Sequence, residues 1–452
     1  METPTAKLGT SGSTLNVSEI IDNSEIRALH VVIFLLCTLC MIIDGFDTQA
    51  LGFVAPAIIQ DWKISPALLG PVFGASNFGV LIGQLTFTVL ADKIGRRPVL
   101  IGGTVFFAVM TILTGRATSI SELLVIRFIA GLGLGSVVPN ATALIGEYSP
   151  RARRVAMMTW LGIGFTAGAA LGGFVAAWMI PRYGWPSVFY IGGASPLVLA
   201  AVMSVYLPES LKLLALRGRE ADRRYIARWL TRVDPRVAVS GDTVFMVPEV
   251  AKRGVPVRHL FGEGRARFTL LLWVINFMNL LELYSLANWL PTVVRGAGYS
   301  TSTAVLVGTT LQVGGTLSPF LLAWLITKKG FAPVLTVTFA IATLAVATMG
   351  QPWLSLGMLL VTVFIAGACV PGAQPALNTL SGTFYPTSLR STGLGWGLGI
   401  GRVGSIVGPV IAGWFIAAHW PTQAIFLTLA VPALIATTAV VMLRSTIDAH
   451  RP

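Results

Sequence analysis

The stretch ADKIGRRPVL at residues 91–100 recurs 235 residues later as ITKKGFAPVL at residues 326–335, with five of ten positions identical. Each copy follows the second of six apolar runs in its half of the chain. A weak internal repeat of this kind is typical of membrane proteins built from two parallel repeats. The repeat therefore predicts two related halves of six helices each.

The apolar runs around the repeat are long enough to cross a bilayer. The chain has 452 residues and only 11% of them are charged, whereas a soluble protein carries about 25%. About 20 apolar residues span the hydrocarbon core as a helix. We therefore predict an all-α membrane protein with twelve transmembrane helices in two pseudo-symmetric six-helix bundles, near residues 29–55, 67–90, 98–115, 121–147, 155–180, 186–207, 268–293, 301–327, 333–350, 353–383, 391–415 and 421–443.

These runs divide the chain into five parts. We expect a polar tail at 1–28 without a cleavable signal peptide, a bundle at 29–207, a linker at 208–266, a bundle at 267–443 and a tail at 444–452. The linker is charged and partly amphipathic, which favours one or two surface helices.

The net charge of +13 is explained by topology. If the N-terminus is cytoplasmic, 26 of the 32 Lys and Arg fall in cytoplasmic tails and intervals, four fall in outer loops, and Arg127 and Arg402 lie within helices. An excess of Lys and Arg in cytoplasmic loops sets the orientation of a membrane protein. Both termini are predicted to be cytoplasmic, and no nucleic-acid partner is expected.

Several motifs carry a resemblance to a known family. LADKIGRRPVL (90–100) resembles the loop pattern G-x-L-A-D-[RK]-x-G-R-[RK] of the major facilitator superfamily, with Thr88 in place of the first glycine. More narrowly, the chain is similar to the aromatic acid:proton symporter family in DGFDTQALGFVAPAI (44–58), RFIAGLGLGSVVPNATALIGEYSP (127–150), LPES (207–210) and GAQPALNTLSGTFYPTSLRSTGLGWGLGIGRVGSIVGP (372–409).

The resemblance implies the fold of that superfamily, a place in the bacterial cytoplasmic membrane, and proton-coupled uptake of a small aromatic carboxylate such as 4-hydroxybenzoate, protocatechuate or benzoate. We further expect a monomer driven by the proton gradient, without a cofactor. Two alternatives stay open: a proton-coupled antiporter that exports aromatic or drug-like compounds, and a transporter-like receptor for aromatic acids.

A charged side chain inside a membrane helix has an unfavourable free energy, so it usually faces a cavity or a partner. Asp44 and Asp47 are three residues apart and share a helix face. At 1.5 Å per residue, Asp44 lies roughly 22 Å above the inner end of its helix and Arg127 roughly 9 Å below the outer surface, so their depths nearly coincide. We expect Arg127 to pair with the two-acid site in at least one state and the site to take up a proton. The resemblance implies that these residues are needed for uptake; the alternative is a static ion pair that braces two helices.

Arg402 lies near mid-membrane, where transporter substrates bind. Its guanidinium matches a carboxylate, so we predict that it holds the carboxylate of the substrate. The alternative is a structural partner of Glu282 or of a backbone carbonyl. Glu282 itself is a departure from the family, and it could be a second titrating group, a counter-ion for Arg402, or a carboxyl group facing the cavity.

An aromatic ring needs apolar walls and a few polar groups. The candidate walls are Phe46, Tyr284 and Trp396, and the candidate polar groups are Gln374 and Asn378. Each of these five residues could instead serve ordinary packing.

Glu147 follows Arg127 by 20 residues, about 30 Å along a helix, which places it at the cytoplasmic rim beside Asp92, Arg96 and Arg97. This constellation resembles the charge latch of the superfamily and implies a conformational role. The family motif also marks Arg390, which we predict to be a gate residue at the cytoplasmic end of its helix.

Other chemistry is not supported by the sequence. GIGRVG (399–404) satisfies the dinucleotide fingerprint but lies inside an apolar helix, where the fingerprint has no strand before it. Cys37 and Cys40 lie within an apolar run and are expected to be core thiols. We expect no metal site and no enzymatic activity.

Overall fold

The computed structural model describes residues 14–237, 239, 243–247, 257–386 and 389–448. The other parts of the predicted tails and linker, and Thr387 and Ser388 of the quoted family motif, lie outside the described residues. Within the described part, twelve helical segments are long and apolar enough to cross a membrane, which confirms the predicted number.

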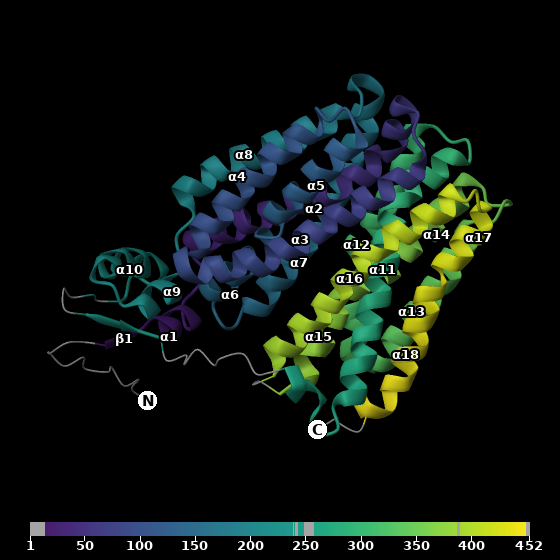
Figure 1. Ribbon diagram of the computed structural model, residues 1–452. Helices are drawn as coiled ribbons and strands as arrows, with labels where there is room; N and C mark the ends of the chain where they lie inside the picture. The colour runs from purple at the N-terminus through teal and green to yellow at the C-terminus, as the bar shows by residue number, and fades with distance from the viewer. Residues whose placement is uncertain (1–13, 238, 240–242, 248–256, 387–388, 449–452) are drawn as a thin grey trace.

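The helices form two bundles joined by the linker (Figure 1). The N-terminal bundle consists of α2 (Ala28–Trp62), η1 (Pro66–Leu68), α3 (Leu69–Ile94), α4 (Arg96–Thr114), α5 (Ile120–Leu134), α6 (Val137–Tyr148), α7 (Arg154–Tyr183) and α8 (Pro186–Tyr206). After η2 (Val257–Phe261), the C-terminal bundle consists of α11 (Ala266–Gly296), α12 (Thr301–Lys329), α13 (Phe331–Met349), α14 (Leu356–Cys369), η3 (Pro371–Ala373), α15 (Gln374–Phe384), α16 (Arg390–Ala417), α17 (Thr422–Leu429) and α18 (Val431–Asp448).

Three of the predicted continuous helices are broken. The breaks separate α5 from α6, α14 from α15, and α17 from α18. A proline lies in or just after each break: Pro371 lies within the break between α14 and α15, and Pro139 and Pro432 lie just after the other two. Proline has no N–H to donate to the carbonyl four residues earlier, and its ring crowds that carbonyl, so the helix is interrupted there.

A small cap lies at one end of the N-terminal bundle. It contains α1 (Val17–Asp22), α9 (Leu211–Arg217), α10 (Glu220–Val233), and the strands β1 (Thr14–Asn16) and β2 (Val244–Met246), which pair in parallel. The cap packs on the N-terminal bundle through a shared apolar cluster that includes Val17, Leu211 and Leu230. The two strands were not predicted, because three residues are too few to show a sequence period.

The cap defines two ends of the molecule. The end that carries α1, α9 and α10 is called the linker face, and the opposite end, which carries the α2–α3, α7–α8 and α11–α12 connections, is called the far face. The two bundles come together toward the far face and diverge toward the linker face, as a V (Figure 1).

Hydrogen bonds between side chains and backbone hold the bundles together on the far-face side. Gln49 Nε2 donates to the carbonyl of Ala287 at 2.5 Å, and Gln312 Nε2 donates to Gln49 Oε1 at 3.1 Å. Asn77 Nδ2 donates to the carbonyl of Ser405 at 3.1 Å. All five residues are nearer to the far-face ends of their helices than to the linker-face ends.

Glycines set the distance between α2 and α7. A Cβ added at Gly45 would lie 1.9 Å from the carbonyl oxygen of Phe165, and one added at Gly168 would lie 1.9 Å from that of Ile42. Small residues of this kind let two membrane helices approach closely. Gly162, also on α7, faces open space.

We expect Gly168→Val to destabilise the protein by about 1–3 kcal/mol or more, because the added methyl groups force α2 away from α7. Thermal unfolding of the purified full-length protein measures the effect as a lower Tm. Gly162→Val makes the same change on the same helix and should leave Tm nearly unchanged. Equal losses for the two variants would contradict the close α2–α7 contact.

Candidate functional site

An ion pair is buried in the middle of the N-terminal bundle. Asp47 on α2 and Arg127 on α5 are both 0% exposed. Arg127 Nη2 lies 3.1 Å from Asp47 Oδ2, and Arg127 Nη1 lies 3.3 Å from Asp47 Oδ1. Thr111 on α4 donates to Asp47 Oδ1 at 2.6 Å. The pair and its hydroxyl donor therefore join three helices of one bundle.

Asp44, one helical turn before Asp47, does not share this ion pair. It is 4% exposed and lines a pocket between the two bundles. Arg127 thus pairs with the predicted two-acid site through Asp47, and in this conformation Asp44 faces the pocket instead.

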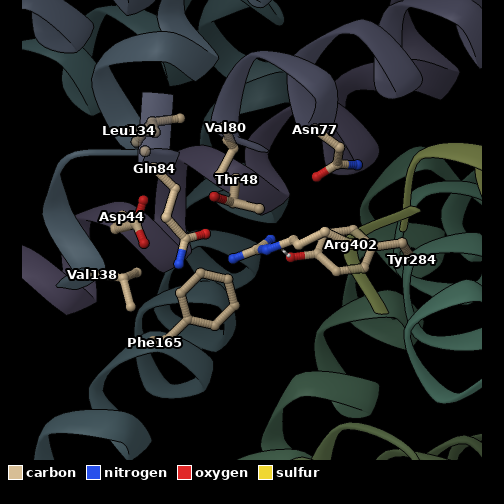
Figure 2. Close-up of a pocket in the computed structure, with 11 residues that line it drawn as sticks. Asp44, Thr48, Asn77, Val80, Gln84, Leu134, Val138, Phe165, Tyr284 and Arg402 are labelled. Carbon is tan, nitrogen blue, oxygen red and sulfur yellow. Dashed lines mark hydrogen bonds between the residues drawn. The ribbon is translucent and has the colours of Figure 1, made fainter. Parts of the chain in front are cut away.

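The pocket is narrow in this conformation, with a cavity volume of about 10 Å³, and it takes most of its lining from the N-terminal bundle. Tyr284 on α11 and Arg402 on α16 come from the other bundle (Figure 2). The complete lining is Asp44, Thr48, Asn77, Val80, Gln84, Leu134, Gly135, Val138, Phe165, Tyr284 and Arg402.

The break between α5 and α6 contributes directly to this lining. Leu134 and Gly135 lie at the end of α5, and Val138 lies in the first turn of α6. Discontinuous membrane helices often form transporter sites, because irregular backbone is tolerated at membrane depth only where protein or a water-filled cavity surrounds it. This break was not predicted, because residues 121–147 read as one continuous apolar run.

Arg402 reaches into the pocket toward the N-terminal bundle (Figure 2). Its Nη1 donates to the hydroxyl of Tyr284 at 3.1 Å. Across the described part of the chain, no hydrogen bond or ion pair joins Arg402 to Asp44. A guanidinium and a carboxylate from opposite bundles therefore face one pocket without binding each other directly.

Two other predicted wall residues lie elsewhere. The ring of Phe46 packs on Gly172 and Gly192. A Cβ added at Gly172 would lie 3.0 Å from this ring, and one added at Gly192 would lie 2.9 Å from it. Trp396 stacks on Trp273, with ring centroids 5.8 Å apart. Neither Phe46 nor Trp396 lines the pocket, which corrects their predicted role as walls.

The two predicted polar groups are occupied in a chain of side-chain amides, called here the amide chain. Asn279 Nδ2 donates to Gln374 Oε1 at 2.8 Å. Gln374 Nε2 donates to Asn276 Oδ1 at 3.1 Å and to Asn378 Oδ1 at 3.2 Å. These bonds tie α15 to α11 within the C-terminal bundle. Gln374 and Asn378 do not line the pocket, so their predicted role as substrate-binding groups is corrected as well.

Glu282 is neither a counter-ion of Arg402 nor part of the pocket lining. Its side chain is 0% exposed, and both carboxyl oxygens lack a hydrogen-bond partner among the described residues. Two residues separate it from Tyr284, about 200° around the helix, so it points to the other side of α11. The predictions that it pairs with Arg402 or faces the cavity are therefore wrong.

The predicted latch residues gather at the linker face of the N-terminal bundle. Arg96 at the start of α4 pairs with Glu147 on α6 at 2.8 Å and lies 3.9 Å from Asp92. The hydroxyl of Ser210 also donates to Glu147. Arg390 lies exposed at the linker-face end of α16, in the other bundle.

Sequence reasoning missed Glu209 as a member of this group. Glu209 Oε1 accepts the backbone N–H of Arg96 at 2.9 Å and that of Arg97 at 3.2 Å, so it caps the N-terminus of α4. A carboxylate is favoured there by the helix dipole. The side chain of Arg97 donates to the carbonyl of Ser204. The motif LPES, directly after an apolar helix, was the available signal.

Comparison with known proteins gives one consistent result. The profile of the Major Facilitator Superfamily matches residues 37–353 and 272–452. The chain is 39% identical over 434 residues to a 4-hydroxybenzoate transporter of Pseudomonas putida, covering 95% of this chain and 96% of that protein. It is 38% identical over 428 residues to a gallate transporter of Pseudomonas putida, covering 94% of each.

The fold is also found among solved structures. A crystal structure of a bacterial homologue of the human lysosomal transporter Spinster, in an inward-facing and occupied conformation, matches with a TM-score of 0.72 and 18% identity. The match covers 93% of this chain and 98% of that one. At this identity the likeness shows the fold alone.

The two acids on α2 should differ in their effect on stability. Asp47→Asn leaves the Arg127 guanidinium buried without a counter-charge, and removing one partner of a buried pair costs about 3–5 kcal/mol. Asp44→Asn removes no direct ion pair and should change Tm little. Thermal unfolding of the two variants measures the difference.

The double variant Asp47→Asn/Arg127→Gln is the matched control. It should lose less stability than the two single changes added together, because the unpaired charge is gone. Similar losses of Tm for Asp44→Asn and Asp47→Asn would contradict the separation of the two acids.

Proposed function

Because the chain belongs to the major facilitator superfamily, we propose that it couples proton entry to the uptake of a small aromatic carboxylate. Candidate substrates are 4-hydroxybenzoate, protocatechuate and benzoate. Two relatives that cover nearly the whole chain are named as transporters of 4-hydroxybenzoate and gallate, which are both carboxylates on hydroxylated rings. The observation that carries the proposal is the pocket in which Asp44 and Arg402 face each other from different bundles.

The pocket offers complementary groups to such a substrate. The guanidinium of Arg402 matches a carboxylate, and its bond to the Tyr284 hydroxyl holds it in place. Phe165 offers an apolar surface for the ring, while Gln84 and Thr48 offer hydrogen bonds to ring hydroxyls. A site built from an apolar wall and a few polar groups binds such ligands well.

Proton coupling follows from competition for Arg402. While Asp44 is ionised, its charge acts on Arg402 across the pocket, and a second carboxylate is disfavoured by repulsion. A proton on Asp44 removes that repulsion and leaves the guanidinium to the substrate. Proton and anion therefore bind together in this scheme. The Asp47–Arg127 pair serves as the fixed brace that orients α2 beside the pocket.

Transport requires the pocket to open to each side in turn. The distribution of Lys and Arg supports a cytoplasmic location for the linker face and both termini, and in that orientation the two bundles diverge toward the cytoplasm. The Gln49 and Asn77 hydrogen bonds hold the far face closed. We assign Asp92, Arg96, Arg97 and Glu147, together with Arg390, to the latch that closes the linker face in the opposite state.

The oligomeric state and the energy source complete the proposed function. The pocket is complete within one chain, so we propose a functional monomer. The proton gradient across the bacterial cytoplasmic membrane supplies the work of accumulation, without a cofactor.

Full-length protein in proteoliposomes should accumulate radiolabelled 4-hydroxybenzoate when the interior is alkaline, and an uncoupler should abolish the accumulation. Asp44→Asn should abolish proton-driven accumulation and keep substrate binding, because the amide mimics the protonated acid. Glu220→Gln, the corresponding change at an exposed acid, is the control and should behave like the wild type. Substrate export under an inward proton gradient would instead support an antiporter, and binding without any flux would support a receptor.

Arg402→Gln should weaken binding of 4-hydroxybenzoate about ten- to hundredfold, since a hydrogen bond to a charged group contributes about 1.5–3 kcal/mol. Arg402→Lys should lose less because the charge is kept. The neutral amide of the same ring is the informative competitor. The wild type should prefer the acid to the amide strongly, and Arg402→Gln should prefer it weakly; an unchanged preference would place the carboxylate elsewhere.

A further inference from the structure

Glu282 occupies a part of the molecule that the transport scheme does not use. It lies about midway along α11, and the opposite side of the helix carries Tyr284 into the pocket. The side chain of Glu282 is completely buried within the C-terminal bundle. The thiol of Cys369, at the end of α14, is close enough to the Glu282 carboxyl group to interact with it electrostatically.

The surroundings of Glu282 are apolar. Cys369 belongs to an apolar cluster with Ala342, Val370 and Ala433, and Leu283, which follows Glu282, packs against this cluster. In the described part of the chain, no hydrogen-bond donor reaches either oxygen of the Glu282 carboxyl group. Three further helices, α13, α14 and α18, supply the apolar residues of this cluster.

The three acids in the membrane interior are stabilised differently. Asp47 has a guanidinium and a hydroxyl donor. Asp44 faces a pocket that also holds Arg402. Glu282 has neither, and an isolated carboxylate in apolar surroundings carries a very large desolvation cost. As a neutral carboxylic acid, Glu282 has a much smaller cost, so in this conformation it holds a proton.

A protonated carboxyl group needs an acceptor for its O–H. Asn279 lies three residues before Glu282, on the same face of α11, and its Oδ1 is buried without a donor among the described residues. The other end of this amide, Nδ2, is already bonded to Gln374. The amide chain therefore ends, on the Glu282 side, in an unused acceptor.

The other end of the amide chain is closer to solvent. Gln374 and Asn378 are half-buried on α15, which runs from the helix break toward the linker face. The chain is thus a polar route from the apolar surroundings of Glu282 toward the linker face, at the junction of α11 with a broken helix. Breaks of this kind are places where a membrane helix can change its shape.

We propose that Glu282 is a second proton-binding site of the transporter, located in the C-terminal bundle, whose O–H donates to Asn279 Oδ1 at the end of the amide chain. Its involvement in transport rests on the proposed proton-coupled function, whereas its state of protonation does not. The site would make the C-terminal bundle sensitive to proton binding, in addition to Asp44 in the N-terminal bundle.

Infrared difference spectroscopy on the full-length protein in lipid tests the site without any transport. In an Asp44→Asn background, the protein should show the C=O stretch of a buried carboxylic acid, shifted in D₂O, and the added change Glu282→Gln should remove it. Glu282→Leu is the second variant and should also lack it, since an apolar side chain of similar size fits the surroundings. Glu220→Gln, at an exposed acid, should keep the band.

Gln374→Leu removes the acceptor of Asn279 Nδ2, which frees the Asn279 amide, and should therefore shift the C=O band of Glu282. In proteoliposomes, the equilibrium substrate gradient at a known proton gradient gives the number of protons per substrate, and Glu282→Gln should lower this number by one. A band that is unchanged in both Glu282 variants would overturn the proposal, as would an unchanged proton number. If the wild type accumulates no substrate, the proposed function fails, while the infrared band still decides whether Glu282 holds a proton.

Discussion

The cost of an isolated charge in a medium without water governs the interior of this protein. A membrane helix satisfies its own backbone, but each ionisable side chain within it needs a partner, a cavity or neutralisation. The Asp47–Arg127 ion pair is the fully buried solution, and its partners come from α2 and α5, with a hydroxyl from α4. Because this pair fixes the rotation of α2, the position of Asp44 one turn away is also fixed, and its side chain faces the other bundle.

The two bundles contribute unequally to the pocket. The N-terminal bundle supplies most of the lining, including the broken backbone between α5 and α6, while the C-terminal bundle supplies Tyr284 and Arg402. A few residues from one rigid body therefore complete a site carried mainly by the other. Since Arg402 moves with the C-terminal bundle, any ligand that bridges it to the N-terminal bundle acts directly on the relative position of the two bundles.

At the linker face, the connecting segments pack against the N-terminal bundle. The cap consists of α1, α9, α10 and the two short strands. Among the described residues, its apolar side chains pack against the N-terminal bundle. Glu209, at the start of the linker, caps α4, and the neighbouring Ser210 bonds to Glu147. Glu209 and Ser210, at the start of the linker, thus belong to the same charge cluster as the loop between α3 and α4.

The sequence alone determined the number of helices, the internal repeat and the family. It also identified Asp44, Tyr284 and Arg402, which the structure brings into one pocket, because hydropathy and a fixed rise per residue give the depth of a side chain in the membrane. Only the tertiary structure decided which acid Arg127 contacts, that Phe46, Gln374, Asn378 and Trp396 lie outside the pocket, and that Glu282 points away from Arg402. The direction of a side chain around its helix axis is set by packing against neighbouring helices, through contacts such as those of Gly45 and Gly168, and no sequence period in a uniformly apolar helix records it.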